Sequence, residues 1–101
     1  MKKLFLLGIR NEWNETLLHI AAQNNSVLMA QLLLNAGLNI DILGNSKYNC
    51  TALYQAIYYG SFDVAQFLIE HGANVNRPDS HGTPPIVKAA EMGSIKPTQQ
   101  R

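Results

Sequence analysis

Apolar residues recur at helical spacing in two stretches of the chain, and both stretches begin and end with the same kinds of residue. Ser26 and Ser61 stand just before them, where a hydroxyl can accept a hydrogen bond from an amide of the first helical turn. Gly37 and Gly72 follow them, where a left-handed turn commonly ends a helix. The pattern predicts two amphipathic helices of one design. Their apolar faces are Val27/Ala30/Leu33/Leu34 and Phe62/Ala65/Leu68/Ile69.

A shorter helix is predicted before each amphipathic helix, and a third copy lies further along the chain. Thr16 and Thr51 can cap the first two, because a Thr hydroxyl accepts from the unpaired amides at a helix start. Pro85 suits the first turn of the third, where its missing N–H donor costs nothing. We expect large apolar residues of these helices to fill the core, and pairs of small residues to let neighbouring helices approach closely. These are Leu18, Leu53 and Ile86, and the pairs Ala21/Ala22 and Ala89/Ala90.

The helix pairs recur at an almost constant interval. Aligning Thr16, Thr51 and Pro84 gives spacings of 35 residues (51 − 16) and 33 residues (84 − 51). Self-similar units of this length are typical of solenoids, in which each unit buries its apolar face only by stacking on its neighbours. The interval therefore predicts a stack of helix–loop–helix repeats.

Three short motifs fall in register within these repeats. Thr-x-Leu-His-x-Ala-Ala runs from 16 to 22, Gly-Ala-Asn-Val-Asn from 72 to 76, and Asp-x-x-Gly-x-x-Pro from 79 to 85. Over residues 11–93 the chain thereby resembles the ankyrin-repeat family, which has a period of about 33 residues. The resemblance implies an all-α ankyrin-repeat solenoid of stacked helix–turn–helix units with projecting hairpin-like loops. It divides a single domain, 1–101, into a stub 1–10, repeats 11–45 and 46–78, a partial repeat 79–97 and a tail 98–101.

The loops depart from the family pattern. Asn14 and Asn49 replace the usual loop Gly, and Asn is the next most tolerant residue of positive φ. The loop from Gly37 to Thr51 spans 14 residues (51 − 37), against 12 residues (84 − 72) for its counterpart in the next repeat. The first of these loops therefore carries two extra residues.

The signature His of the family occurs once, at His19, and Tyr54 and Val87 take its place in the other repeats. In the family this His usually hydrogen-bonds between repeats, so we expect the polar tie between repeats to be thinned. Two whole repeats and half of a third also leave the inner helix at 85–92 uncapped, and about three repeats are normally needed for stability. We expect marginal stability, self-association through the open C-terminal end, or an origin in a longer array.

Composition narrows the classes of partner. The chain has eight Lys and Arg against seven Asp and Glu and no concentrated basic stretch, which disfavours nucleic acid. No apolar run approaches the 18 or so residues of a membrane span, and the short run before Arg10 is interpreted as part of a packing helix, not a signal peptide. Cys50 is the single cysteine, which fits a reducing compartment. We expect an intracellular, cytoplasmic protein, in a host cytoplasm if the source is an intracellular microbe.

Catalytic and metal chemistry is disfavoured by the spacing of the candidate groups. His19, His71 and His81 occupy different slots of different repeats, so no metal cluster is expected. Cys50 and His81 lie in neighbouring loops and could form a nucleophile pair, but nothing supplies an oxyanion hole or an orienting acid. We therefore expect no enzyme, no metal and no cofactor.

Ankyrin-repeat proteins meet their partners at loop tips, at the residue before the Thr and at the two residues before the mid-repeat Gly. Here Trp13, Tyr48 and His81 share one slot in three successive loops, which predicts an aromatic row, and Tyr58 and Tyr59 stand behind it. The tips are Glu12-Trp13, Lys47-Tyr48 and Ser80-His81, the residues before the Thr position are Glu15, Cys50 and Thr83, and the pairs before the Gly position are Gln23-Asn24, Tyr58-Tyr59 and Glu91-Met92.

The predicted function is a protein–protein interaction module that binds a partner through loop tips and the inner-helix face, because Trp and Tyr dominate binding hot spots. The residues expected to carry it are Trp13, Lys47, Tyr48, Tyr58, Tyr59 and His81. Trp13 has an equally weighted alternative, which is to cap the first repeat. For the whole chain, the alternatives are a structural spacer or regulatory fragment of a larger multidomain enzyme or effector, or an ankyrin-like fragment with little function left.

Overall fold

A computed structural model describes residues 8–92, and within that range the chain forms five α-helices and no strand. The predicted all-α solenoid is confirmed. The stub up to residue 7 and the segment from residue 93, including the end of the partial repeat, lie outside the described residues. The helices are α2 (Leu17–Gln23), α3 (Val27–Asn35), α4 (Ala52–Tyr58), α5 (Phe62–Glu70) and α6 (Pro85–Met92).

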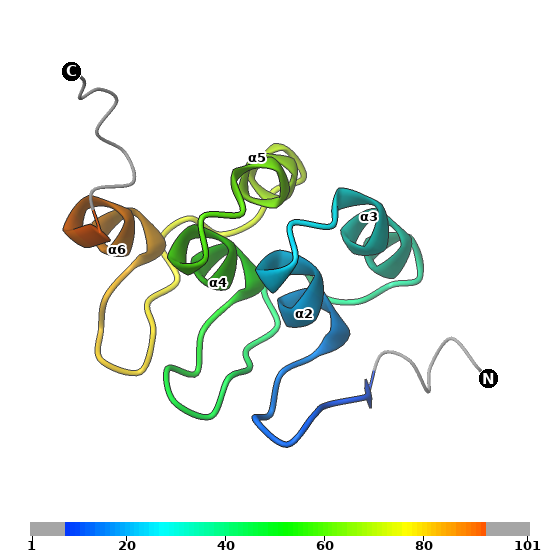
Figure 1. Cartoon of the computed structure of the whole chain (residues 1–101), viewed down its shortest axis with the longest axis horizontal. Coiled ribbons are helices and arrows are strands. Elements are labelled where there is room, and N and C mark those ends of the chain that lie inside the picture. Colours follow the sequence, from blue (N-terminus) through cyan, green and yellow to red (C-terminus); the bar gives the residue numbers. More distant parts are fainter. Residues whose placement is uncertain (1–7, 93–101) are drawn as a thin grey trace.

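The helices form two rows with three loops projecting from one side (Figure 1). The inner row is α2, α4 and α6, in which α4 packs against both of its neighbours. The outer row is α3 and α5, which also contact each other. The three projecting loops are finger 1 (residues 10–16), finger 2 (residues 44–50) and finger 3 (residues 79–83). Stacking of short units thus places the fingers next to the inner helices.

The helix starts agree with the predicted capping residues at three of four positions. The hydroxyls of Thr16, Thr51 and Ser26 accept hydrogen bonds from backbone amides two or three residues into α2, α4 and α3. Asn14 and Asn49 have φ of 60° and 44°, as expected for residues that replace Gly in a left-handed turn. These local choices fix where each helix begins.

The prediction that Ser61 caps α5 with its side chain is wrong. Ser61 occupies the cap position, but its hydroxyl donates to the Gln23 carbonyl at 3.4 Å. The amide of Val64 instead donates to Oδ1 of Asn25 at 3.1 Å. The preceding repeat therefore supplies the capping acceptor for α5, which makes the cap a contact between repeats.

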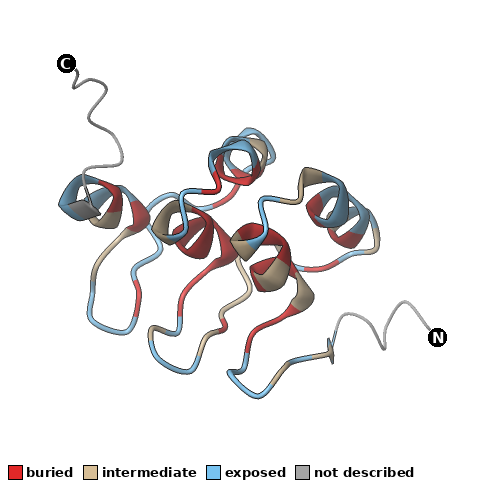
Figure 2. Cartoon of the chain, viewed as in Figure 1, coloured by how far each residue is buried: buried red, intermediate tan, exposed pale blue. Residues whose placement is uncertain are grey.

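The core runs between the two rows and along the inner helices (Figure 2). Leu18 and Leu53 are fully buried there, as predicted, and the alanines at 21, 22 and 56 are buried at the close approaches between helices. Ile86 was expected to supply core volume in the same way, but its side chain is 54% exposed. Among residues 8–92, no outer helix follows α6 in the way that α3 follows α2 and α5 follows α4, so the slot that is closed in α2 and α4 stays open.

Candidate functional site

The fingers are built on the same turn, in which one side-chain oxygen holds two backbone amides. Oδ1 of Asn11 accepts from Trp13 at 3.0 Å and Glu15 at 2.9 Å. Asn45 in finger 2 and Asp79 in finger 3 accept in the same manner, at distances of 2.8–3.0 Å. Such side-chain acceptors mimic a backbone turn and hold it without a regular strand. These hydrogen bonds therefore fix the backbone conformation of each finger tip.

Backbone hydrogen bonds also join each finger to the next. The amides of Asn45 and Ser46 donate to the carbonyls of Asn14 and Trp13 at 3.1 and 2.8 Å, and Ser80 donates to Tyr48 at 2.6 Å. The three tips consequently form one continuous edge. Side chains carried on this edge are preorganised, which lowers the entropy cost of binding.

The predicted aromatic row is present in part. The ring of Tyr48 lies 6.2 Å from the ring of His81, and 6.1 and 5.7 Å from those of Tyr54 and Tyr58. Trp13 is in none of the aromatic pairs found among residues 8–92 and is 59% exposed. That exposure disfavours the alternative in which Trp13 caps the first repeat. Tyr48 thus joins a cluster with its own inner helix, and Trp13 stands apart from it.

One of the two extra residues explains why Tyr48 turns away from Trp13. The turn acceptor precedes the capping position by five residues in fingers 1 and 3 (16 − 11 and 84 − 79) but by six in finger 2 (51 − 45). Lys47 therefore takes the turn position that Trp13 occupies in finger 1. Tyr48 is displaced one place toward α4, where it meets Tyr58.

Two lysines place their ammonium groups over this tyrosine cluster. The Nζ atom of Lys47 is 5.2 Å from the centre of the Tyr48 ring. Lys88, on α6, has its Nζ 5.9 Å from Tyr48 and 5.8 Å from Tyr58. Distances within about 6 Å are those of attractive cation–π contacts. The exposed faces of these two rings are thus partly covered by the chain's own cations.

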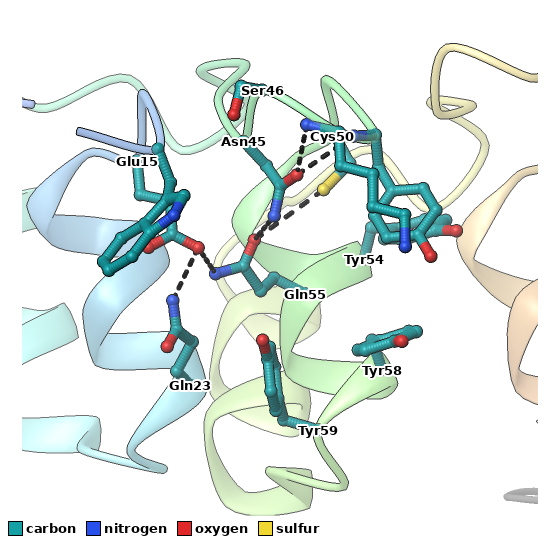
Figure 3. Close-up of a pocket in the computed structure, with 12 residues that line it drawn as sticks. Glu15, Gln23, Asn45, Ser46, Cys50, Tyr54, Gln55, Tyr58 and Tyr59 are labelled. Atoms are coloured by element: carbon teal, nitrogen blue, oxygen red, sulfur yellow. Dashed lines mark hydrogen bonds between the residues drawn. The ribbon is translucent and has the colours of Figure 1, made fainter. Parts of the chain in front are cut away.

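A pocket of about 420 Å³ opens between fingers 1 and 2 and the inner helices α2 and α4 (Figure 3). It unites most of the residues predicted to bind a partner, but not His81. The lining residues are Trp13, Glu15, Gln23, Asn45, Ser46, Lys47, Tyr48, Cys50, Tyr54, Gln55, Tyr58 and Tyr59.

The polar part of this pocket is a network around Glu15, which is 6% exposed. Its Oε2 accepts from the side-chain amides of Gln23 at 2.6 Å and Gln55 at 2.8 Å, and its Oε1 from Asn11 at 2.9 Å. Gln55 in turn accepts from Asn45 at 3.1 Å. Figure 3 shows the carboxylate facing these amides, with Tyr58 and Tyr59 below them at the end of α4. Sequence reasoning missed Gln55 and Asn45. The only signal for Gln55 is a polar residue in a helix slot filled by Ile20 in the first repeat, whereas Asn45 lies in the loop of finger 2.

His19 lies behind this pocket and is fully buried, as expected for a satisfied structural His. Nε2 lies 2.7 Å from the Cys50 carbonyl, which can only accept, so Nε2 carries the proton. Nδ1 then accepts from the Thr16 hydroxyl at 2.7 Å. Burial is the main cause that lowers the pKa of His19, since the hydrogen bond to Cys50 acts the other way. The ring is a neutral tie between the first two repeats.

At the next repeat, the position of the signature His still carries a hydrogen bond between repeats, although the His itself is lost. Tyr54, which stands in the slot of His19, donates its hydroxyl proton to Oδ2 of Asp79 at 2.6 Å. Burial and this hydrogen bond raise the pKa of Tyr54. Burial would by itself raise the pKa of Asp79, but the bonds from Tyr54 and from backbone amides prevail and lower it. Tyr54 and the Asp79 carboxylate thus take the roles that His19 and the Cys50 carbonyl have in the first repeat.

Two of the three positions before the Thr are buried, which corrects the expectation that they face a partner. Glu15 is 6% and Cys50 1% exposed, whereas Thr83 is half-buried. Burial raises the pKa of the Cys50 thiol to about 12, so it stays protonated near neutral pH and does not resemble an activated nucleophile. The imagined pairing of Cys50 with His81 finds no support, because Cys50 contacts Gln55 within its own repeat.

Among residues 8–92, no group of three or more His, Cys, Asp and Glu side chains is arranged to hold a metal ion. In the same part of the chain, every helix is too short to cross a bilayer.

A family model described as ankyrin repeats (3 copies) matches residues 2–79 and 46–96. A probable 26S proteasome regulatory subunit p28 of Saccharomyces cerevisiae is 33% identical over 78 residues, which are 77% of this chain and 34% of that protein. A putative ankyrin repeat protein of fowlpox virus is 29% identical over 90 residues, 88% of this chain and 20% of the viral protein. One from Rickettsia felis is 44% identical over 52 residues, 52% of this chain and 17% of that protein. The chain spans about a third or less of the length of these relatives.

Proposed function

Because the chain belongs to the ankyrin-repeat family, whose repeats are generally protein–protein interaction modules, we propose that it binds a partner protein through the edge formed by fingers 1 and 2 and the inner helices. The observation that carries the proposal is the pocket of about 420 Å³ that five aromatic side chains line between the fingers and α4. Aromatic side chains in a concave, preorganised setting are typical of binding hot spots. The contributing residues are Trp13, Lys47, Tyr48, Tyr58 and Tyr59, with His81 at the margin.

Selection of displayed random peptides on the immobilised chain tests this proposal. Tyr58→Ala/Tyr59→Ala is expected to abolish capture of the enriched peptides while the helical circular dichroism signal is retained. The matched control is Leu28→Ala/Leu32→Ala, which removes apolar side chains that are 68% and 59% exposed on α3, far from the pocket. Peptides that need the α3 pair and tolerate loss of the tyrosines would refute the proposed surface.

A second candidate is a structural spacer or regulatory segment within a larger protein. It is favoured by the lengths of the relatives, of which this chain matches about a third or less. A spacer needs no exposed binding pocket, so the same selection would then enrich no peptide above the background of the empty support. Both candidates are compatible with our expectation of a cytoplasmic location.

Self-association through α6 stays a prediction of the same kind. Ile86 and Val87 are 54% and 42% exposed there, and Ile86 lines a shallow pocket with exposed Phe62 and Ile69 of α5. Sedimentation equilibrium that finds only monomer at high protein concentration would rule it out.

A further inference from the structure

We propose that the pocket takes a Lys or Arg side chain of the partner, inserted between Trp13 and Tyr59 so that its cationic head meets the carboxylate of Glu15. This inference rests on the proposed protein-binding function and specifies the chemistry of the partner. It depends on the charge of the pocket, on the character of its walls and on its size.

The carboxylate of Glu15 is a buried charge whose partners are all neutral. Three side-chain amides donate to it, from Asn11, Gln23 and Gln55, and Oε1 receives only one of these bonds. An ionised carboxylate offers about four acceptor positions, so one is left for a further donor. The one ion pair within residues 8–92 joins Lys88 to Glu91, and none involves Glu15. Buried carboxylates are commonly paired with a cation, so a cationic donor is the complement that this site lacks.

The walls beside Glu15 are aromatic and accessible. Trp13 is 59% and Tyr59 52% exposed, and both line the pocket together with Glu15. Partial desolvation is the largest cause that raises the pKa of Tyr59, and the negative charge of Glu15 is the next, so the Tyr59 hydroxyl lies within the field of the carboxylate. Aromatic faces attract ammonium and guanidinium groups, and Trp does so most strongly.

Around Tyr48, the chain's own lysines already make cation–π contacts of this kind. The ammonium groups of Lys47 and Lys88 lie 5.2 and 5.9 Å from the centre of the Tyr48 ring. No Lys or Arg of residues 8–92 lies over Trp13 or Tyr59 in this way. A cation from a partner would therefore make at Trp13 and Tyr59 the contact that the chain makes internally at Tyr48.

The size and polarity of the pocket favour a side chain with an apolar stem. Its volume of about 420 Å³ lies in the range of pockets that enclose small ligands, about 300–1,000 Å³. The methylene stem of Lys or Arg can pack on apolar surface while its head reaches a polar group. An anionic side chain would instead meet the Glu15 carboxylate, while Lys47, the pocket's own cation, is held over Tyr48 at the finger tip.

The peptides selected on the wild-type chain test the inference, with binding followed by fluorescence of Trp13, which is the single tryptophan. We expect the enriched peptides to share a Lys or Arg at one position. Synthetic peptides with norleucine in its place should bind about tenfold more weakly or worse, because norleucine keeps an apolar stem but lacks the charged hydrogen-bond donor. Because this change is made in the peptide, folding of the chain does not affect the result.

A paired substitution in finger 1 locates the charge. Glu15→Gln should weaken binding of the Lys or Arg peptide as strongly as norleucine does, and should leave the norleucine peptide unaffected. The matched control Glu12→Gln removes an exposed carboxylate that does not line the pocket and should change neither affinity. Peptides that bind at Tyr58 and Tyr59 but share no basic residue, or that keep their affinity with norleucine, would overturn the inference and leave the proposed function standing. Failure to select any peptide would count against the proposed function itself.

Discussion

The junction where α2 and α3 meet α4 and α5 can be compared with the junction where α4 and α5 meet α6. At the first, His19 donates to the Cys50 carbonyl at 2.7 Å and Gln55 to Glu15 at 2.8 Å. The outer helices also touch, and Asn25 of one repeat caps the α5 helix of the next. Polar ties are thus made at the fingers, the inner helices and the outer helices.

At the second junction, the structure shows one strong side-chain tie, from Tyr54 to Asp79, and one finger-to-finger backbone bond, from Ser80 to Tyr48. No outer helix follows α6 within residues 8–92, and Ile86 is half exposed where Leu53 is buried. One repeat design thus gives a closed junction or a half-open one, depending on whether both rows of helices continue. The candidate binding pocket lies at the closed junction, where side chains are held most firmly.

Truncating the equivalent side chains at the two junctions, Leu53 and Ile86, should give the largest difference in the free energy of unfolding. Leu53 is 1% exposed and Ile86 54% exposed. We expect Leu53→Ala to lower the free energy of unfolding by about 2–5 kcal/mol, because it leaves a cavity in the core. Ile86→Ala should cost less than about 1 kcal/mol, since surface substitutions have small effects. Urea denaturation measures both, and equal losses would show that α6 is as closely packed as α4.

The buried hydrogen bonds of His19 and Tyr54, one at each junction, should contribute similar amounts to the free energy of unfolding. His19→Leu leaves the Cys50 carbonyl without its donor, and Tyr54→Phe leaves Oδ2 of Asp79 without its own. We expect each substitution to lower the free energy of unfolding by about 1–3 kcal/mol, the cost of a buried group deprived of its hydrogen bond. If Tyr54→Phe were neutral in urea denaturation, the tie at the second junction would indeed be thinned.

The smallest expected effect is a pH dependence that distinguishes the junctions. The folded-state pKa of His19 is lowered below 6.5 by burial, so below pH 6.5 the unfolded chain takes up a proton that the folded chain does not. The free energy of unfolding should therefore fall as the pH drops below that value, by at most about 1.4 kcal/mol per pH unit. Asp79, whose pKa is also lowered, should add a loss only in more acidic solution. Urea denaturation at pH 7.5, 6.5 and 5.5 checks this, and His19→Gln should remove the slope between the last two.

The repeat architecture could be predicted because helix caps and turn residues act on residues close to them in the sequence. Thr16 and Thr51 cap helices through amides three residues away, and Asn14 accepts positive φ by its own side-chain chemistry. The polar ties were harder to foresee, because they depend on which side chains the stacking brings together. Tyr54 and Asp79 are 25 residues apart, and Glu15 and Gln55 are 40 apart, with no motif that pairs them.

The aromatic row was predicted by aligning equivalent positions of the three fingers, and only part of it is present in the structure. Slot alignment treats the fingers as identical, but the residue added inside finger 2 moves Tyr48 toward Tyr58 and away from Trp13. An alignment that counts residues cannot say on which side of a turn an insertion falls. The acid beneath the pocket was likewise assigned to the surface, although Glu15 is 6% exposed.

The most direct measurement is an NMR titration of the ¹⁵N-labelled chain with a selected peptide. We expect the largest shifts at the Trp13 indole N–H and at the amides of Tyr58 and Tyr59, with small changes along α3. Shifts concentrated at Leu28 and Leu32, with Trp13 unmoved, would place recognition on the outer helices and contradict binding through the pocket between the fingers.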